Sequence, residues 1–255
     1  MSPSFALLGS GEFQPWTDEV DRRLLTSDGS RPRRVLILPT ASSAEGADVF
    51  DMWATKGLDH YARSGIDAEV VPLKTRDDAH RDDLIEALDR ASIAYFSGGN
   101  PAFLVSVLRD TPWWAALLRA MERGLSYAGC SAGVVCLGNL ALDSARREWD
   151  DDLWHPGLSV FPGTMFGPHW DALDRHVPGL REFMIHSLPD RDRLVGIDED
   201  TAIVGDGMDW TVMGTGGIHV LEADVWTQVA SGQDVRLPIL PSVDAGGDPK
   251  RSVTS

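Results

Sequence analysis

Short apolar runs alternate with helix-like segments through the first half of this 255-residue chain. Runs of about five apolar residues are typical of buried strands, whereas amphipathic helices repeat their apolar residues every three or four positions. The predicted strands are residues 5–9, 34–40, 67–73, 93–99 and 125–130. The predicted helices between them are residues 16–27, 47–65, 81–90 and 111–124. This alternation predicts an α/β fold with a mostly parallel sheet and helices on both faces.

The pattern changes after residue 140, where shorter apolar runs are separated by turn residues. No linker in the sequence is long enough to divide two domains, and 43% of the residues are hydrophobic, enough for one full core. We therefore expect a single domain over residues 1–240. Residues 241–255, rich in Gly, Ser and Asp, are expected to form a loose C-terminal tail.

The composition limits the classes of partner. The formal net charge is −16, and an acidic surface repels phosphates, so no nucleic-acid partner is expected. No apolar run approaches the roughly 18 residues of a membrane span, and the first residues lack the cationic start of a secretory signal. The two cysteines, Cys130 and Cys136, flank a tight turn that a disulfide would strain. We expect no membrane partner, a reducing compartment and a cytoplasmic location.

Residues 129–133, Gly-Cys-Ser-Ala-Gly, stand between a predicted strand and a predicted helix. This is the pattern of a nucleophile elbow, in which the serine backbone is strained and flanking glycines let the two chain segments pass. Ser131 is therefore the predicted nucleophile. The N–H of Ala132 and that of Gly99, at the end of a neighbouring strand, are the predicted oxyanion donors.

A serine nucleophile requires a general base. His169 follows Ser131 by 38 residues and comes just after an apolar run, so it is predicted to return to the same edge of the sheet as the base. The other histidines show no HxH or HExxH spacing, so no metal is expected. Residues 9–13, GSGEF, lack the third glycine of a dinucleotide site and the GK[ST] of a phosphate loop. We expect a turn beside the active site there, and no cofactor.

The acid that orients the base is harder to assign. Glu148 lies between Ser131 and His169, on a loop expected to return to the same sheet edge, and is the predicted third member of the triad. Asp150 and Glu199 are the alternatives.

Five stretches also carry a family resemblance: ALLGSGEF, YFSGGNPAFL, AGCSAG, FGPHWD and GIDEDTAI. In this order they resemble the dipeptidase E and cyanophycinase family of serine peptidases, over roughly residues 5–205. The resemblance implies a flavodoxin-like, class I glutamine amidotransferase-like fold over residues 1–240, a nucleophile at Ser131 and a histidine at His169. Known members cleave after aspartyl residues. The Asn-Pro after the double glycine departs from the best-known members, so the chain resembles an uncharacterised branch.

The predicted function is a serine-type peptidase that acts on small Asp-containing peptides through a Ser-His-Glu/Asp triad and an acyl-enzyme. A carboxylate substrate needs a cation in an acidic protein. Asn100, Arg146, Arg147 and Arg175 are the predicted substrate-binding residues. The alternatives are a non-catalytic ligand-binding protein on the same scaffold, a glutamine amidotransferase-like protein and an ordinary α/β-hydrolase esterase. A homodimer and a monomer both remain open, as do exopeptidase and endopeptidase action.

Overall fold

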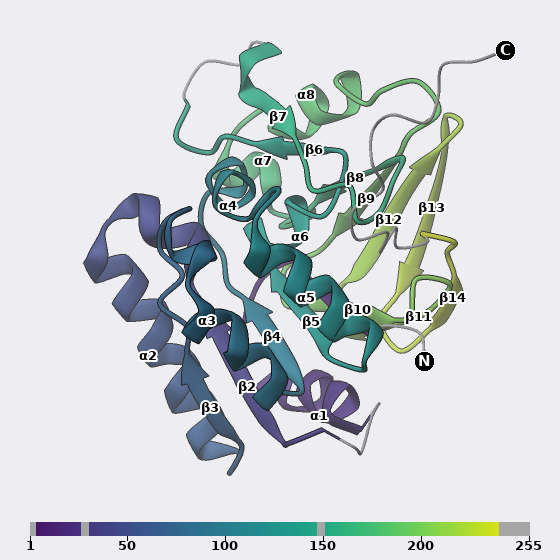
Figure 1. Ribbon diagram of the computed structural model, residues 1–255. Helices are drawn as coiled ribbons and strands as arrows, with labels where there is room; N and C mark the ends of the chain where they lie inside the picture. Colours follow the sequence, from purple (N-terminus) through teal and green to yellow (C-terminus); the bar gives the residue numbers. More distant parts are fainter. Residues whose placement is uncertain (1–3, 27–30, 147–150, 240–255) are drawn as a thin grey trace, which may run out of the picture.

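The structure is a computed structural model that describes residues 4–26, 31–146 and 151–239. Its main sheet has a parallel half made of β1 (Phe5–Leu8), β2 (Arg34–Leu38), β3 (Asp67–Val70), β4 (Ile93–Phe96) and β5 (Ser126–Cys130). Its antiparallel half is made of β10 (Thr201–Gly205), β11 (Asp209–Gly214) and β14 (Asp234–Arg236). The strand order is β14-β11-β10-β1-β5-β4-β2-β3 (Figure 1). The parallel half and its neighbours confirm the predicted α/β fold.

Helices cover both faces of this sheet. Alternate side chains of each strand point to opposite faces, so Ala6 and Leu8 belong to one buried cluster and Phe5 and Leu7 to another. The first cluster packs under α1 (Asp18–Thr26) and α2 (Ala47–Arg63). The second packs under α3 (Asp82–Glu86), α4 (Pro101–Leu108) and α5 (Pro112–Glu122), with α5 crossing the front of the sheet in Figure 1. No helix within the described ranges is both long enough and apolar enough to cross a bilayer.

The predicted strands of the first half are all present, and four of the five end earlier than the sequence predicts. Most of the excess residues are glycine, proline or polar residues, which form the turns that follow the strands. After β3 the excess also includes the buried Val71 and Leu73 on either side of Pro72. Helix α4 is missing from the sequence-based prediction. It is apolar almost all round, so it gives no amphipathic period, and only Asn100 before Pro101 marks its start.

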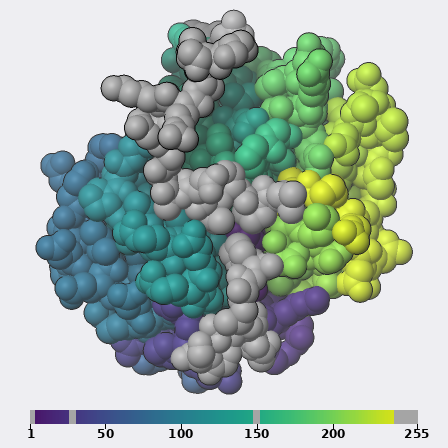
Figure 2. All heavy atoms as spheres, turned by 45° about the vertical axis from the view of Figure 1, so that its right-hand side comes forward, coloured from purple at the N-terminus to yellow at the C-terminus, as the bar shows by residue number. Residues whose placement is uncertain are grey.

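The second half of the chain builds a smaller sheet. It consists of β8 (Thr164–Gly167), β9 (Arg193–Ile197), β12 (Gly217–Glu222) and β13 (Val225–Ala230), in the order β13-β12-β9-β8. Figure 2 shows its last strands as the yellow-green side of the molecule, away from the blue helices. The shorter elements are the hairpin of β6 (Leu140–Leu142) with β7 (Trp154–Pro156), and α6 (Ala132–Val135), α7 (Leu173–His176) and α8 (Leu180–His186). Short 3-10 turns span residues 15–17, 40–45, 78–80, 87–90 and 151–153. The predicted tail, 241–255, lies outside the described residues.

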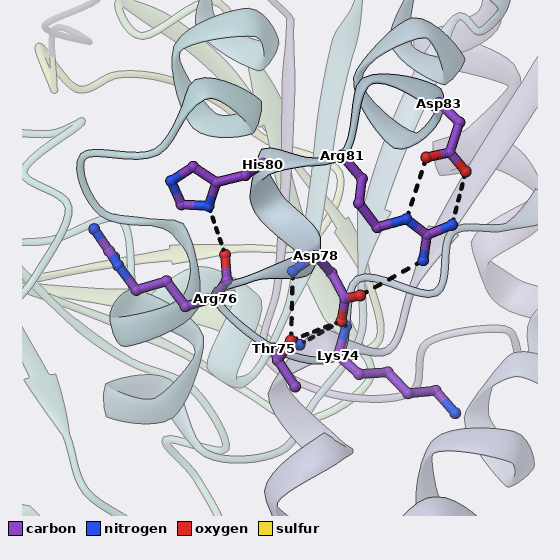
Figure 3. Close-up of polar contacts among 7 residues, drawn as sticks. All are labelled: Lys74, Thr75, Arg76, Asp78, His80, Arg81 and Asp83. Carbon is purple, nitrogen blue, oxygen red and sulfur yellow. Dashed lines mark hydrogen bonds and ion pairs between the residues drawn. The ribbon is translucent and has the colours of Figure 1, made fainter.

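The segment after β3 is held together by its own polar groups (Figure 3). The Asp78 carboxylate accepts hydrogen bonds from the backbone N–H groups of Lys74 and Thr75, at 3.1 and 2.9 Å, and from the Thr75 hydroxyl. Burial raises the pKa of Asp78, but these hydrogen bonds outweigh it and lower that pKa below 3.8 overall. The Arg76 guanidinium donates to the carbonyls of Ser106 and Arg109, which ties the segment to α4. The cluster therefore serves the scaffold at the edge of the sheet.

Helix α2 lies unusually close to strand β2. A Cβ atom on Gly57 would lie 2.8 Å from Cδ1 and 3.0 Å from Cγ2 of the buried Ile37, so any side chain at this crossing requires Ile37 to shift within the core. A buried polar network fixes the helix from its other side, because Asp21 of α1 accepts from His60 at 2.7 Å and from the Tyr61 hydroxyl at 3.1 Å. The depth and rotation of α2 are thus set by both neighbours.

We expect Gly57→Ala to lower the free energy of unfolding by about 1–3 kcal/mol, because overpacking against Ile37 outweighs the better helix propensity of alanine. Chemical denaturation measures this change. Thr55→Ala on the exposed face of the same helix is the control and should be neutral or slightly stabilising. Stabilisation by Gly57→Ala would contradict the tight crossing.

Candidate active site

The elbow at Ser131 joins β5 to α6 through a strained residue. Ser131 has φ 50° and ψ −106°, a conformation that non-glycine residues adopt rarely. The two segments pass so closely that a Cβ on Gly129 would lie 2.3 Å from the carbonyl oxygen of Gly133. The N–H of Ser131 donates to Leu8 of β1 at 3.1 Å. The elbow is therefore locked into the sheet, and the partly exposed Ser131 lies just past the carboxyl end of β5.

His169 follows β8 and reaches the serine. Its Nε2 lies 3.2 Å from Oγ of Ser131, within hydrogen-bonding distance. The next residue, Trp170, is buried, and its backbone N–H donates to the Ile197 carbonyl at 3.0 Å. Its indole lies against Gly196, where a Cβ would be 2.5 Å from the ring. This packing anchors the chain beside the histidine, so the imidazole is held by the second sheet.

Glu199 holds the other nitrogen of the histidine. Nδ1 of His169 lies 3.0 Å from Oε1 of Glu199, and Nε2 of His176 lies 3.0 Å from the same oxygen. Hydrogen bonds from His176 and then from His169 lower the pKa of Glu199 below 4.5, so the group is a carboxylate at neutral pH. A carboxylate on Nδ1 keeps the proton there and leaves Nε2 free to accept one from Ser131.

The prediction of Glu148 as the acid is not tested by the described residues, among which Glu199 is the carboxylate that contacts His169. Glu148 and Asp150 lie outside the described residues, and the Nδ1 position is taken by Glu199, which the sequence offered only as an alternative. The reason lies in strand pairing. β8 and β9 are parallel neighbours, and Gly167 faces Gly196 in the register. His169 and Glu199 each come two residues after the end of these strands, so they emerge side by side.

Residues 98–99 form a glycine loop beside the nucleophile. A Cβ on Gly98 would lie 3.6 Å from Cβ of Ser131. Gly99 has φ +139°, and a Cβ there would lie 2.4 Å from the carbonyl carbon of Ala41, so the position requires glycine. The Gly98 N–H donates to Glu12 at 3.0 Å. Within the described ranges the N–H groups of Gly99 and Ala132 donate to no protein group, which leaves both available to an oxyanion.

Glu12 is a site residue that sequence reasoning missed. It is 8% exposed, and its two oxygens accept from the Gly98 N–H and from the Cys130 thiol, the latter at 2.9 Å. Glu12 therefore ties the loop after β1 to the glycine loop and to the strand of the nucleophile. Burial, and then the Glu12 carboxylate, raise the pKa of Cys130 well above its usual value. Cys130 is a neutral buried thiol and not the thiolate that an amidotransferase needs.

The predicted substrate-binding residues are dispersed. Asn100 is 7% exposed and caps α4, since its Oδ1 accepts from the Phe103 N–H at 3.2 Å and its Nδ2 donates to Asp143 at 2.7 Å. The structure thus gives Asn100 a scaffold role. Arg146 lies 4.0 Å from the Asp152 carboxylate, and Arg175 is exposed on α7 next to His176. Arg147 lies outside the described residues.

Three groups of this site match the donors of a divalent cation. The nitrogen atoms of His169 and His176 and a carboxylate oxygen of Glu199 all lie within 4.8 Å of one another. The sequence does not reveal the trio because its members come from the loop after β8, the end of α7 and the turn after β9. A cation bound there would occupy the same atoms that orient His169, so it would compete with the hydrogen bonds of the base.

A family model, Peptidase family S51, matches residues 5–213. Among curated relatives, a cyanophycinase of Trichormus variabilis is 23% identical over 228 residues, which cover 85% of this chain and 72% of that protein. A cyanophycinase of Geminocystis herdmanii is 23% identical over 239 residues, 90% of this chain and 84% of that protein.

Two solved structures share the fold. The crystal structure of a peptidase from an acI-B1 actinobacterium has a TM-score of 0.84 and 28% identity, covering 93% of this chain and 98% of that one. A putative peptidase E protein of Listeria monocytogenes has a TM-score of 0.61 and 17% identity over 85% of this chain and 100% of that one, which shows the fold alone.

We expect Glu199→Gln to lower kcat/KM by about 10²–10⁴, because the amide no longer stabilises an imidazolium at His169. Glu148→Gln is the matched comparison and should stay within about threefold of the parent protein. Steady-state kinetics on both variants, with their melting temperatures as a folding check, decide between the two acids. The reverse pattern would return the role to Glu148.

We expect Asn100→Ala to cost about 1 kcal/mol of unfolding free energy through the lost cap, while KM stays unchanged. Asn100→Ser keeps a capping oxygen and should retain most of that stability. Denaturation and KM measured on both variants test the scaffold role. A several-fold rise in KM with unchanged stability would restore the predicted contact with substrate.

Proposed function

We propose, from the premise that the chain belongs to peptidase family S51 and is a serine-type peptidase, that it cleaves small Asp-containing peptides through Ser131, His169 and Glu199. The observation that carries the proposal is the continuous chain of contacts from Ser131 Oγ to His169 Nε2 at 3.2 Å and from His169 Nδ1 to Glu199 Oε1 at 3.0 Å. A strained elbow and an aligned base are costly features that a binding protein does not need.

The geometry supports acylation in two steps. Ser131 Oγ attacks the peptide carbonyl while His169 Nε2 takes its proton, and the Glu199 carboxylate stabilises the resulting imidazolium. The N–H groups of Gly99 and Ala132 stabilise the oxyanion of the tetrahedral intermediate. When the C–N bond breaks, His169 returns the proton to the leaving nitrogen, and an ester to Ser131 remains.

Hydrolysis of that ester repeats the same proton transfers with water as the nucleophile. His169 takes a proton from water, the hydroxide adds to the acyl carbon, and the proton goes back to Ser131 Oγ as the C–O bond breaks. The free acid leaves and the triad is restored. The substrate, one water molecule and the triad account for every proton that is transferred.

The substrate class rests on the resemblance and on the relatives. Cyanophycinases act, by their name, on cyanophycin, and members of the resembling family cleave after aspartyl residues. Arg175, one residue from His176, is a candidate cation for an acyl-side carboxylate. Both cysteines are free and buried, which fits the proposal of a cytoplasmic, reducing location.

We expect Ser131→Ala to keep the melting temperature and to lower kcat/KM by about 10³ or more. A fluorophosphonate probe should label the parent protein at Ser131 and leave this variant unlabelled. Ser106→Ala, at an exposed serine of α4, is the control and should keep both activity and labelling. Retained turnover of the best substrate by Ser131→Ala would overturn the mechanism.

The substrate class is tested by a panel of Asp-X dipeptides, isoaspartyl dipeptides and neutral esters at equal concentration. We expect the highest kcat/KM for an Asp-containing peptide. Far faster turnover of neutral esters would leave the serine hydrolase chemistry in place and remove the Asp-directed specificity.

A further inference from the structure

A hollow of about 450 Å³ opens beside His169, within the range of small-molecule sites. One wall is the loop after β1, residues 10–14, and the other is a face of α2. The α2 wall carries Trp53, Lys56 and Arg63. The hollow therefore joins the base to a helix that has no part in the triad.

The chemistry of the base assigns this hollow to one side of the substrate. The nitrogen that leaves the peptide must come within hydrogen-bonding distance of His169 Nε2, because that atom protonates it. The part of the substrate beyond that nitrogen therefore extends along the surface next to His169. In a short peptide, the leaving amino acid carries its own carboxylate two bonds from the nitrogen.

The α2 wall carries the charge that such a carboxylate requires. Lys56 and Arg63 are seven residues apart, hence on one face of the helix, and both are exposed. Among the described residues neither forms an ion pair, although the Lys56 ammonium lies 4.4 Å from the centre of the Trp53 ring. Both cations therefore line the hollow beside His169 with no carboxylate bound to either of them among the described residues.

Two carboxylates share the hollow and must be weighed against these cations. Glu12 is nearly buried, and both of its oxygens already accept hydrogen bonds from the protein. Asp59 is exposed on α2 between Lys56 and Arg63, so it weakens their attraction for an anion. Arg63 also lines a neighbouring hollow of about 420 Å³ with Arg22 and Arg33, where Asp18 and the Arg22–Glu19 ion pair offset part of the positive charge.

We propose that Lys56 and Arg63 bind the carboxylate of the leaving amino acid and so select substrates whose leaving group is an anion. The proposal rests on the proposed peptidase function and adds a recognition site on the leaving side of the cleaved bond. Trp53 supplies an apolar wall and holds the Lys56 ammonium over its ring. Both charges act in binding, and the chemical steps stay with the triad.

The test compares the best Asp-X dipeptide with its C-terminal amide. The parent protein should prefer the free carboxylate by about 10–100-fold in kcat/KM, mainly through KM. The double variant Lys56→Met/Arg63→Met keeps the apolar stems and should bring that ratio close to 1. Asp59→Asn should raise the ratio above that of the parent protein. Arg119→Met, which removes an exposed charge on α5, is the control and should leave it unchanged.

An equal rate on the acid and the amide in the parent protein would overturn the proposal, as would an unchanged ratio in a folded double variant. A failure of the peptidase function looks different, because then no peptide is cleaved at all. In that event, esters with a carboxylated or an uncharged leaving alcohol repeat the comparison at the same hollow. Loss of their ratio in the double variant supports the proposal, and its persistence overturns it.

Discussion

The close passage of Gly129 and Gly133 is the constraint on which the site depends. A methyl group at Gly129 would lie 2.3 Å from the Gly133 carbonyl oxygen, and one at Gly133 would lie 2.6 Å from the Phe96 carbonyl oxygen, so the elbow requires glycine at both positions. That turn gives Ser131 its left-handed backbone and points the start of α6 at the reacting carbonyl. Because β5 lies between β1 and β4, the loops that follow those two strands reach the same place, and they bring Glu12 and Gly99 to the serine.

The turn that connects β9 of the second sheet to β10 of the main sheet completes the site. This turn meets the loop after β1. There the backbone N–H of Gly9 donates to the Thr201 carbonyl at 2.9 Å, and the backbone N–H of Asp200 donates to the Ser10 hydroxyl at 3.0 Å. The same turn is braced from the other side, since the Glu199 N–H donates to Asp171 at 2.8 Å. The carboxylate on Nδ1 of His169 is thus held by residues that lie far apart in the chain.

The sequence predicts the features that follow from local patterns. These are the alternation of strands and helices, the elbow and the placement of His169. Glu199 does not follow from any local pattern, because its position depends on β8 and β9 pairing in parallel across 25 intervening residues. Helix α4 has no amphipathic period to detect, and Glu12 looks like a surface residue until Gly98 and Cys130 close over it. Local chemistry therefore predicts Ser131 and His169, whereas long-range pairing decides which carboxylate contacts His169 and which residue supports the glycine loop.

Gly57 stands next to Lys56 in α2, the helix proposed to face the leaving group, and it sets how deeply that helix sits on β2. Core packing and surface charge are consequently linked through one residue without a side chain. Replacement of Gly57, or a larger side chain at position 37 beneath it, would push α2 away from β2. Lys56 and Arg63 would then move relative to His169. Substrate preference in such proteins can diverge through buried positions while the triad stays the same.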